Sequence, residues 1–353
     1  MIRRKRIISL IFVFSFILTV GILNSFAQIR TEIGESNGWR EIQFNFGNLE
    51  PPFFNWCSSG KKLVLGGKGE KGLRLLDIEN GNFQDITANP KHKYPSCSSD
   101  GRYVFFTDSS DRSYKNLYVY DIKAKKISDI YSLNNPLPIQ IINDPLSPSG
   151  KYLVGPGDWK KQIRLPGGEE VSVIPVRGTV EIGKPPRYFQ SRWSFQGNKL
   201  FLINSRGKIL SIRDAITNRQ TDIRLKMESF IDAKPSPDNN NVYIYALPLK
   251  TKSVNLYLMH LNNLKEVPKM IIEDVFGFDV DGNGNIVFSR LYEEGFERLY
   301  VYDRNNKMTL IKEYFMSAWP MNPQVSKNGK AIAFFRKPKE DQKLITVLIR
   351  NDR

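Results

Sequence analysis

The chain is poor in the residues that most often carry catalysis: its 353 residues include two histidines and two cysteines. A zinc site or a histidine-dependent nucleophile needs imidazoles that converge, or one imidazole held beside the reacting group. His92 and His260 lie far apart in the sequence. We therefore expect no histidine-based metal site, and we expect His260 to be exposed and structural.

The chain also lacks any block of five or more charges of one sign, although its formal net charge is +16. A basic surface outside the cytosol meets anionic lipid heads, acidic glycans or acidic proteins before it meets nucleic acid. Because the lysines and arginines are scattered, we favour the simpler interpretation that they keep the domain soluble. No nucleic-acid partner is expected.

Long hydrophobic runs are absent after residue 27. The single run, residues 7–23, follows four consecutive cations at residues 3–6, and Ser25 and Ala27 place small residues at the positions that a signal peptidase reads. We predict a cleaved signal peptide over residues 1–27 and a periplasmic or extracellular location. An uncleaved membrane anchor is the alternative, because a run of 17 residues is near the lower limit for spanning a bilayer. Membrane association is expected only in that case.

The sequence does contain enough apolar surface for a folded core, with 41% hydrophobic and 12% aromatic residues. It also contains a recurring pattern, in which a Ser/Pro/Asp/Asn/Gly turn follows an apolar or aromatic residue and precedes an alternating apolar run. The turns are anchored at Gly60, Gly101, Gly150, Gly197, Asn240, Gly284 and Gly329. Their spacing of 41 to 49 residues matches one four-stranded blade of a β-propeller.

Each turn has a physical basis, because a Gly or Asn at its tip tolerates positive φ and lets two strands fold back in a tight hairpin. A run of the Leu-Tyr-Val-Tyr-Asp type then provides the third strand, as in residues 117–121 and 299–303. The third repeat is irregular, with residues 166–187 typical of an insertion. We predict an all-β fold, a seven-bladed β-propeller of four-stranded antiparallel blades, with six blades as the alternative.

The two ends of the pattern complement each other. The seventh repeat ends after its third strand, residues 343–350, whereas residues 39–46 form a strand with no place in the first repeat. We predict that this N-terminal strand is the outer strand of the last blade, which closes the ring and removes an exposed sheet edge. The expected organisation is a linker over residues 28–38 and a propeller over residues 39–353.

The Ser-Pro-Asp-Gly-type turns and the Leu-Tyr-Val-Tyr-Asp third strands resemble the WD-like repeats of the TolB-type propeller family, over roughly residues 40–350. The resemblance implies an extracytoplasmic binding scaffold. TolB itself carries an additional N-terminal domain, which the short segment between the predicted signal peptide and residue 39 is not expected to hold. Its particular envelope partners are therefore not carried over.

Residues Gly34-Glu-Ser-Asn-Gly38 match the Gly-x-Ser-x-Gly elbow of hydrolases. That elbow works on a sharp turn between a strand and a helix. Here it lies in a polar segment with no helix after it, so we interpret it as part of the linker.

Asp279, Asp281, Asn283 and Asn285 resemble the start of a calcium loop, with oxygen ligands at alternate positions. The closing acid of such a loop is missing, because the twelfth position is Arg290. The same stretch is also the hairpin turn of the sixth repeat. No cofactor is expected other than this calcium candidate.

Cys57 and Cys97 occupy nearly the same place in consecutive repeats, on strands expected to be adjacent and innermost. A disulfide between the first two blades fits this placement in an exported protein, and two separate buried thiols are the alternative.

Aromatic residues recur at equivalent places in the repeats, so we expect them to pack between blades: Trp56, Tyr103, Tyr152, Trp193 and Tyr243. Non-periodic residues, such as Trp159 and the insertion over residues 167–187, are better candidates for a binding surface, because loops on a rigid frame carry function. The sequence does not specify the binding residues further.

These features predict an exported, non-catalytic, monomeric propeller that presents loops to a protein or glycan partner in the cell envelope. The alternative is a propeller enzyme, a glycan or peptide hydrolase or lyase that uses acidic residues at the mouth of the central channel. Acidic side chains converging on that mouth would favour the enzyme. An aromatic or lysine-rich rim would favour the binding protein.

Overall fold

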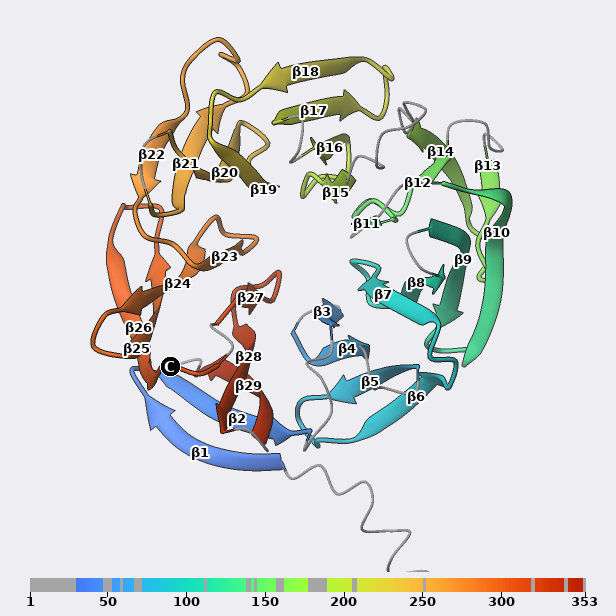
Figure 1. Ribbon diagram of the computed structural model, residues 1–353. Coiled ribbons are helices and arrows are strands. Elements are labelled where there is room, and N and C mark those ends of the chain that lie inside the picture. Colours follow the sequence, from blue (N-terminus) through green and yellow to red (C-terminus); the bar gives the residue numbers. More distant parts are fainter. Residues whose placement is uncertain are drawn as a thin grey trace, which may run out of the picture.

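The strands of the chain form seven sheets arranged in a ring around a central axis (Figure 1). The computed structural model describes residues 30–46, 53–57, 60–66, 72–110, 113–137, 141–142, 145–156, 162–176, 189–204, 208–249, 252–318, 321–339 and 342–351. The protein is a seven-bladed β-propeller, which confirms the predicted fold class over the six-bladed alternative. None of the described residues belongs to a helix with the length and hydropathy of a membrane span.

Four blades follow the predicted plan of consecutive antiparallel strands, ordered from the axis outward. Blade 1 contains β3 (Phe53–Cys57), β4 (Lys62–Gly66), β5 (Leu73–Asp77) and β6 (Phe83–Thr87). Blade 2 contains β7 (His92–Cys97), β8 (Tyr103–Ser110), β9 (Ser113–Asp121) and β10 (Lys126–Leu137). Blade 5 contains β19 (Ser229–Pro235), β20 (Asn241–Leu247), β21 (Asn255–His260) and β22 (Lys269–Ile272). Blade 6 contains β23 (Gly277–Val280), β24 (Ile286–Tyr292), β25 (Phe296–Tyr302) and β26 (Met308–Phe315).

Blades 3 and 4 share the irregularity expected of the third repeat. In blade 3, β14 (Glu170–Val176) lies between β12 (Tyr152–Pro156) and β13 (Gln162–Arg164), and it runs parallel to β12. Blade 4 contains the four antiparallel strands β15 (Phe189–Trp193), β16 (Lys199–Asn204), β17 (Ile209–Asp214) and β18 (Gln220–Arg224). The short β11 (Ile141–Ile142) pairs in parallel with β15, so the chain before blade 3 adds a strand to blade 4.

Blade 7 is closed by the N-terminal part of the chain, as the sequence predicts. Its inner strands are β27 (Gln324–Val325), β28 (Ala331–Lys339) and β29 (Gln342–Arg350). The N-terminal strand β2 (Trp39–Asn45) pairs antiparallel with β29 along its whole length. The outer strand of the last blade is therefore supplied from the other end of the sequence (Figure 1).

The predicted linker over residues 28–38 is wrong for its central part, because Arg30–Ser36 forms a fifth strand, β1, which pairs with β2. Asn37 and Gly38 join the two strands with φ values of 50° and 78°. Two consecutive residues with positive φ form the tight turn that matches the twist of a two-stranded hairpin, and Asn-Gly is its strongest sequence signal. The Gly-x-Ser-x-Gly stretch thus belongs to a strand and a hairpin turn.

A serine begins the turn between the first two strands in five of the described hairpins: Ser98, Ser147, Ser194, Ser236 and Ser326. Its carbonyl accepts from the N–H three residues on, and its hydroxyl from the N–H five residues on. At the fifth turn the residue with positive φ is Asn239 (59°), one position before the predicted anchor.

Seven clusters of buried hydrophobic side chains fill the seven seams between neighbouring blades. The side chains of β2 illustrate how alternation serves two seams at once. Ile42 and Phe44 pack against blade 1, while Trp39 packs against blade 6. Each blade is therefore held by both neighbours, and the ring forms a rigid frame for the residues at its axis.

Candidate functional site

The inner strands surround the axis of the ring (Figure 1). Residues of these strands line a cavity of about 650 Å³. Its wall is built by β3, β7, β15, β19, β23 and β27, together with residues of the turns that flank these strands. Residues from six blades and from the start of the third repeat thus face one space. Because so many parts of the ring converge on this cavity, we take it as the candidate site.

Two ion pairs join neighbouring blades in the wall of this cavity. Arg192 on β15 donates hydrogen bonds of 3.2 and 2.9 Å to the two carboxylate oxygens of Asp232 on β19. Lys234 Nζ on β19 lies 2.8 Å from Oδ1 of Asp279 on β23. These are the two carboxylates among the described residues of the wall. Both are paired with a cation.

The residues of the calcium candidate serve different partners. Asp279 accepts a hydrogen bond of 2.8 Å from the N–H of Val325, which ties blade 6 to blade 7. Asp281 accepts bonds of 2.8 Å from the N–H groups of Asn283 and Asn285, so it caps its own hairpin in the place where other blades use serine. Carboxylate oxygens of both Asp279 and Asp281 thus accept hydrogen bonds from N–H donors. Within the described ranges, no three His, Cys, Asp or Glu side chains form a metal-binding group, and calcium stays a sequence prediction.

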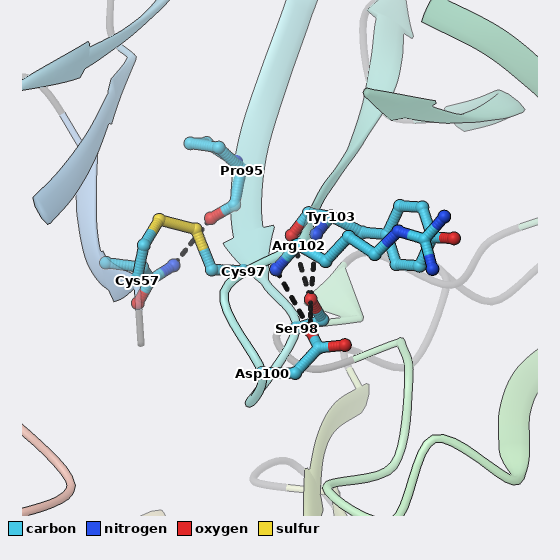
Figure 2. Close-up of a disulfide and its surroundings, with 8 residues drawn as sticks. Cys57, Pro95, Cys97, Ser98, Asp100, Arg102 and Tyr103 are labelled. Carbon is cyan, nitrogen blue, oxygen red and sulfur yellow. Dashed lines mark hydrogen bonds between the residues drawn. A yellow bond between two sulfur atoms is a disulfide. The ribbon is translucent and has the colours of Figure 1, made fainter. Parts of the chain in front are cut away.

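Cys57 on β3 and Cys97 on β7 form a disulfide across the seam between blades 1 and 2, with 5.1 Å between their Cα atoms (Figure 2). Two residues before each cysteine, the Asn55 side chain donates a hydrogen bond of 2.6 Å to the carbonyl of Pro95. Cys97 also lines the cavity. A covalent bond therefore fixes two of the cavity's inner strands to each other.

One end of the ring carries most of the exposed large apolar side chains. In an antiparallel blade, the starts of the first and third strands and the ends of the second and fourth strands lie at the same end. We call this end the mouth face, and its exposed apolar residues are Phe53, Ile231, Leu249, Phe276, Leu291, Phe315 and Met316. The opposite end carries five described residues of this kind, Ile216, Val267, Met270, Met308 and Leu310. The mouth face thus carries the larger share, with seven.

Three of the mouth-face residues, Phe53, Ile231 and Phe276, also line the cavity. Exposed apolar side chains of the mouth face thus stand at the opening of the cavity. Exposed apolar side chains beside a cavity mark a candidate interaction site.

The periodic aromatic residues pack between blades, as expected from the sequence. Trp56 donates its ring N–H to a carbonyl of blade 7 at 2.9 Å, and Trp193 stacks on Tyr152 across the seam between blades 3 and 4. Tyr103 and Tyr243 belong to the hydrophobic clusters of two other seams. Trp56 and Trp193 also form part of the cavity wall.

The two histidines lie apart and neither belongs to the cavity wall. His92 is buried, contacts Thr87 Oγ1 at 2.9 Å and packs against the ring of Tyr118. Burial lowers the pKa of His92, because the charged imidazolium loses its hydration. His260 is exposed, as predicted, and contacts Asn241 Oδ1 at 2.6 Å.

The described part of the predicted insertion forms a contact between blades. Residues 167–168 lie in the turn between β13 and β14. The Tyr103 hydroxyl accepts a hydrogen bond of 3.2 Å from the Gly167 N–H and donates one of 2.8 Å to Glu169, which also pairs with Arg102. Burial and the bond to Glu169 raise the pKa of Tyr103 to about 12. Trp159 and residues 177–187, also predicted to be part of the binding surface, lie outside the described residues.

The comparisons with known proteins identify the fold and no family. No protein-family description and no curated protein matches the sequence. An oligogalacturonate lyase in complex with manganese is similar in structure, with a TM-score of 0.55, 11% identity, and coverage of 92% of this chain and 96% of that chain. The β-propeller domain of Cps50 (Swd1) from Myceliophteria thermophila is also similar, with a TM-score of 0.53 and 11% identity. The match covers 87% of this chain and 98% of that chain.

TolB from Acinetobacter baumannii is also among the similar structures, with a TM-score of 0.44, 11% identity, and coverage of 78% of this chain and 59% of that chain. At these identities the likeness is one of fold. The matches to the lyase and to Cps50 support the propeller fold, and no family is identified.

Sequence reasoning missed the mouth face and the ion pairs of the cavity wall. The exposed residues Phe276, Phe315 and Met316 each lie at or just beyond a strand end, where no periodic pattern assigns them to a surface. The predicted order of antiparallel strands is a usable signal, because it assigns each strand start and strand end to one of the two ends of the ring. Comparing the apolar residues assigned to each end would have indicated the mouth face.

Proposed function

We propose that the chain is an exported binding protein that docks a protein partner on the mouth face, with an apolar side chain of the partner entering the axial cavity. The observation that carries this proposal is that Phe53, Ile231 and Phe276 are exposed at the mouth face and also line the cavity. Export and a periplasmic or extracellular location rest on the apolar run after the N-terminal cations.

A protein partner suits this surface better than a glycan. Three polar side chains of the wall that could hydrogen-bond sugar hydroxyls, Arg192, Asp232 and Asn55, are occupied by contacts between blades. The outer mouth-face residues Leu249, Phe315 and Met316 extend the apolar surface away from the cavity. Apolar area spread over a face is what a protein interface buries.

Binding is also favoured over catalysis by the criterion that the sequence suggested. The charged residues of the wall are Arg192, Asp232, Lys234, Asp279 and Lys327. Both carboxylates are engaged in ion pairs between blades, and the wall also contains aromatic residues such as Trp56 and Tyr94 beside uncharged polar ones such as Gln190 and Asn322. A hydrolase or lyase that used acidic residues at this mouth would need an acid that is not held in an ion pair, and the described residues of the wall contain none.

The proposal predicts that removing apolar side chains from the mouth face weakens partner binding without affecting the fold. The double variant Leu249→Ser/Phe315→Ser should retain about tenfold less of the partner from envelope extracts, since each exposed anchor of an interface contributes on the order of 1 kcal/mol or more. The variant Ile216→Ser/Val267→Ser changes the same kind of residue at the opposite end and serves as the control. Quantitative mass spectrometry of the retained proteins is the measurement.

Equal retention by both double variants would contradict the proposal, as would selective binding to a glycan array with no protein retained. Turnover of a glycoside or peptide by the purified chain would favour the enzyme instead. Phe315 is 75% exposed, so its replacement removes no core contact that could unfold the protein.

A further inference from the structure

Tyr94, in the wall of the cavity, has a backbone conformation that is unfavourable for its side chain. Its φ is 55°, in the left-handed region where a residue with a bulky side chain is an outlier. The pairing of β7 with β8 is interrupted at this point, between Lys93 and Ser96. Tyr94 therefore sits in a bulge of the inner strand, and its side chain is re-aimed away from the direction that a regular strand would give it.

Contacts with blade 1 hold this conformation. Phe53, Asn55 and the disulfide cysteine of β3 are alternate residues of one strand, so they share one side of it. The Phe53 ring lies 5.3 Å from the Tyr94 ring, between centroids, and the Asn55 side chain binds the carbonyl of Pro95. The disulfide then fixes β7 two residues further on. Three successive contacts across one seam thus fasten the strained residue from one side.

A second bulge acts in the same way on the facing wall. The pairing of β19 with β20 is interrupted between Phe230 and Asp232, and the unpaired residue, Ile231, lines the cavity. Bulges are enriched beside functional sites because they turn a side chain toward a ligand. Backbone strain that the surrounding structure maintains also concentrates at binding sites. The bulge in β7 places the Tyr94 ring, and the bulge in β19 places the Ile231 side chain, in the wall of the cavity.

We propose that Tyr94 is the specificity-determining residue of the mouth face. Its ring, packed on the 52% exposed Phe53, contacts the apolar side chain that the protein partner inserts into the cavity. The inference rests on the proposed function and adds to it the residue that selects the partner. The contacts across the seam between blades 1 and 2 hold the ring in place before the partner binds. Binding therefore does not include the entropy cost of ordering this side chain.

The backbone part of this proposal is tested without a partner. In an ordinary strand glycine is less favourable than alanine, whereas at positive φ the order is reversed. The midpoint of thermal unfolding should therefore be about 1–2 °C higher for Tyr94→Gly than for Tyr94→Ala, the two variants lacking the same ring. A lower midpoint for Tyr94→Gly would overturn the assignment of strain at this position.

The contact with the partner is tested by placing the photo-cross-linker p-benzoylphenylalanine, in separate variants, at positions 94, 315 and 216 of the full chain in producing cells. The expected result is an adduct of one and the same protein at positions 94 and 315, and none at position 216. The Tyr94→Phe variant should retain as much of that protein as the unchanged chain does. The Tyr94→Gly variant should retain about tenfold less.

Adducts at position 315 without any at position 94 would overturn the role of Tyr94 and leave the proposed function standing. Adducts at neither position, or equally at position 216, would overturn both. Equal retention of the partner by Tyr94→Gly and Tyr94→Phe would likewise overturn the role of Tyr94.

Discussion

Deletion of residues 28–46 is expected to leave a chain that does not fold. β2 provides the outer partner of β29 through seven residue pairs, and its side chains enter two seams. Ile42 and Phe44 are fully buried, and Trp39 is nearly so. Burial of each side chain contributes about 1.5–3 kcal/mol, and the three together are comparable to the net stability of about 5–15 kcal/mol typical of a folded protein.

The measurement is thermal unfolding followed by circular dichroism, with size-exclusion chromatography to detect aggregation. The matched control is deletion of residues 28–36 alone, which removes β1 and leaves β2 paired. Residues 31–35 of β1 are exposed, so the shorter deletion should lower the midpoint by only a few degrees. A chain without residues 28–46 that melts like the full chain would contradict the closure of the ring by β2.

The substitution Arg336→Ala is expected to cost about 3–5 kcal/mol of unfolding free energy, the range found when one member of a buried charge cluster is removed. Arg336 on β28 is 7% exposed, donates a hydrogen bond of 2.9 Å to the carbonyl of Phe315 and lies 4.1 Å from the centre of the Tyr314 ring. The buried carboxylates of Glu41 and Glu297 lie close enough to favour its charged form. Without the guanidinium, both carboxylates would be left buried with less compensation.

Two pKa directions agree with this account of the cluster. Burial lowers the pKa of Arg336 and raises that of Glu297, so each charged form is maintained against a cost of desolvation. Glu41 belongs to β2 and also lies 3.1 Å from Lys312 Nζ of blade 6. The cluster therefore connects the N-terminal strand to blades 6 and 7.

Urea unfolding measures the effect of Arg336→Ala, with Lys339→Ala as the control on the same strand. Lys339 is exposed at the strand end, and replacing it should change the unfolding free energy by less than about 0.5 kcal/mol. A loss below about 1 kcal/mol for Arg336→Ala would show that the cluster does not depend on this guanidinium.

The number of blades and the closure of the ring could be predicted because their signals are local. A residue that tolerates positive φ, such as Gly101 or Gly329, is needed at each hairpin tip whatever surrounds it. Counting such tips gives the number of blades. Asn37-Gly38 is an equally local signal for the hairpin turn between β1 and β2. The segment was nevertheless predicted to be a linker because its composition is polar.

The site could not be predicted in the same way, because it depends on how neighbouring blades are placed against each other. The contact between Phe53 and Tyr94 joins two inner strands whose relative offset no single repeat encodes. Asp281 shows the converse difficulty. Its position in the turn is compatible with a calcium ligand and with a hairpin cap, and only the positions of the N–H donors distinguish the two.

Hydrogen exchange in β2 tests the ring most directly, since all the proposals for the cavity and the mouth face require a closed frame. Mass spectrometry should show the peptide covering residues 39–46 to be as protected as the peptide covering residues 344–350 of β29. The reason is that amides in a central ladder of a closed ring open only with the whole fold. Exchange of residues 39–46 within seconds, while residues 344–350 stay protected, would show that the N-terminal strand does not close the propeller.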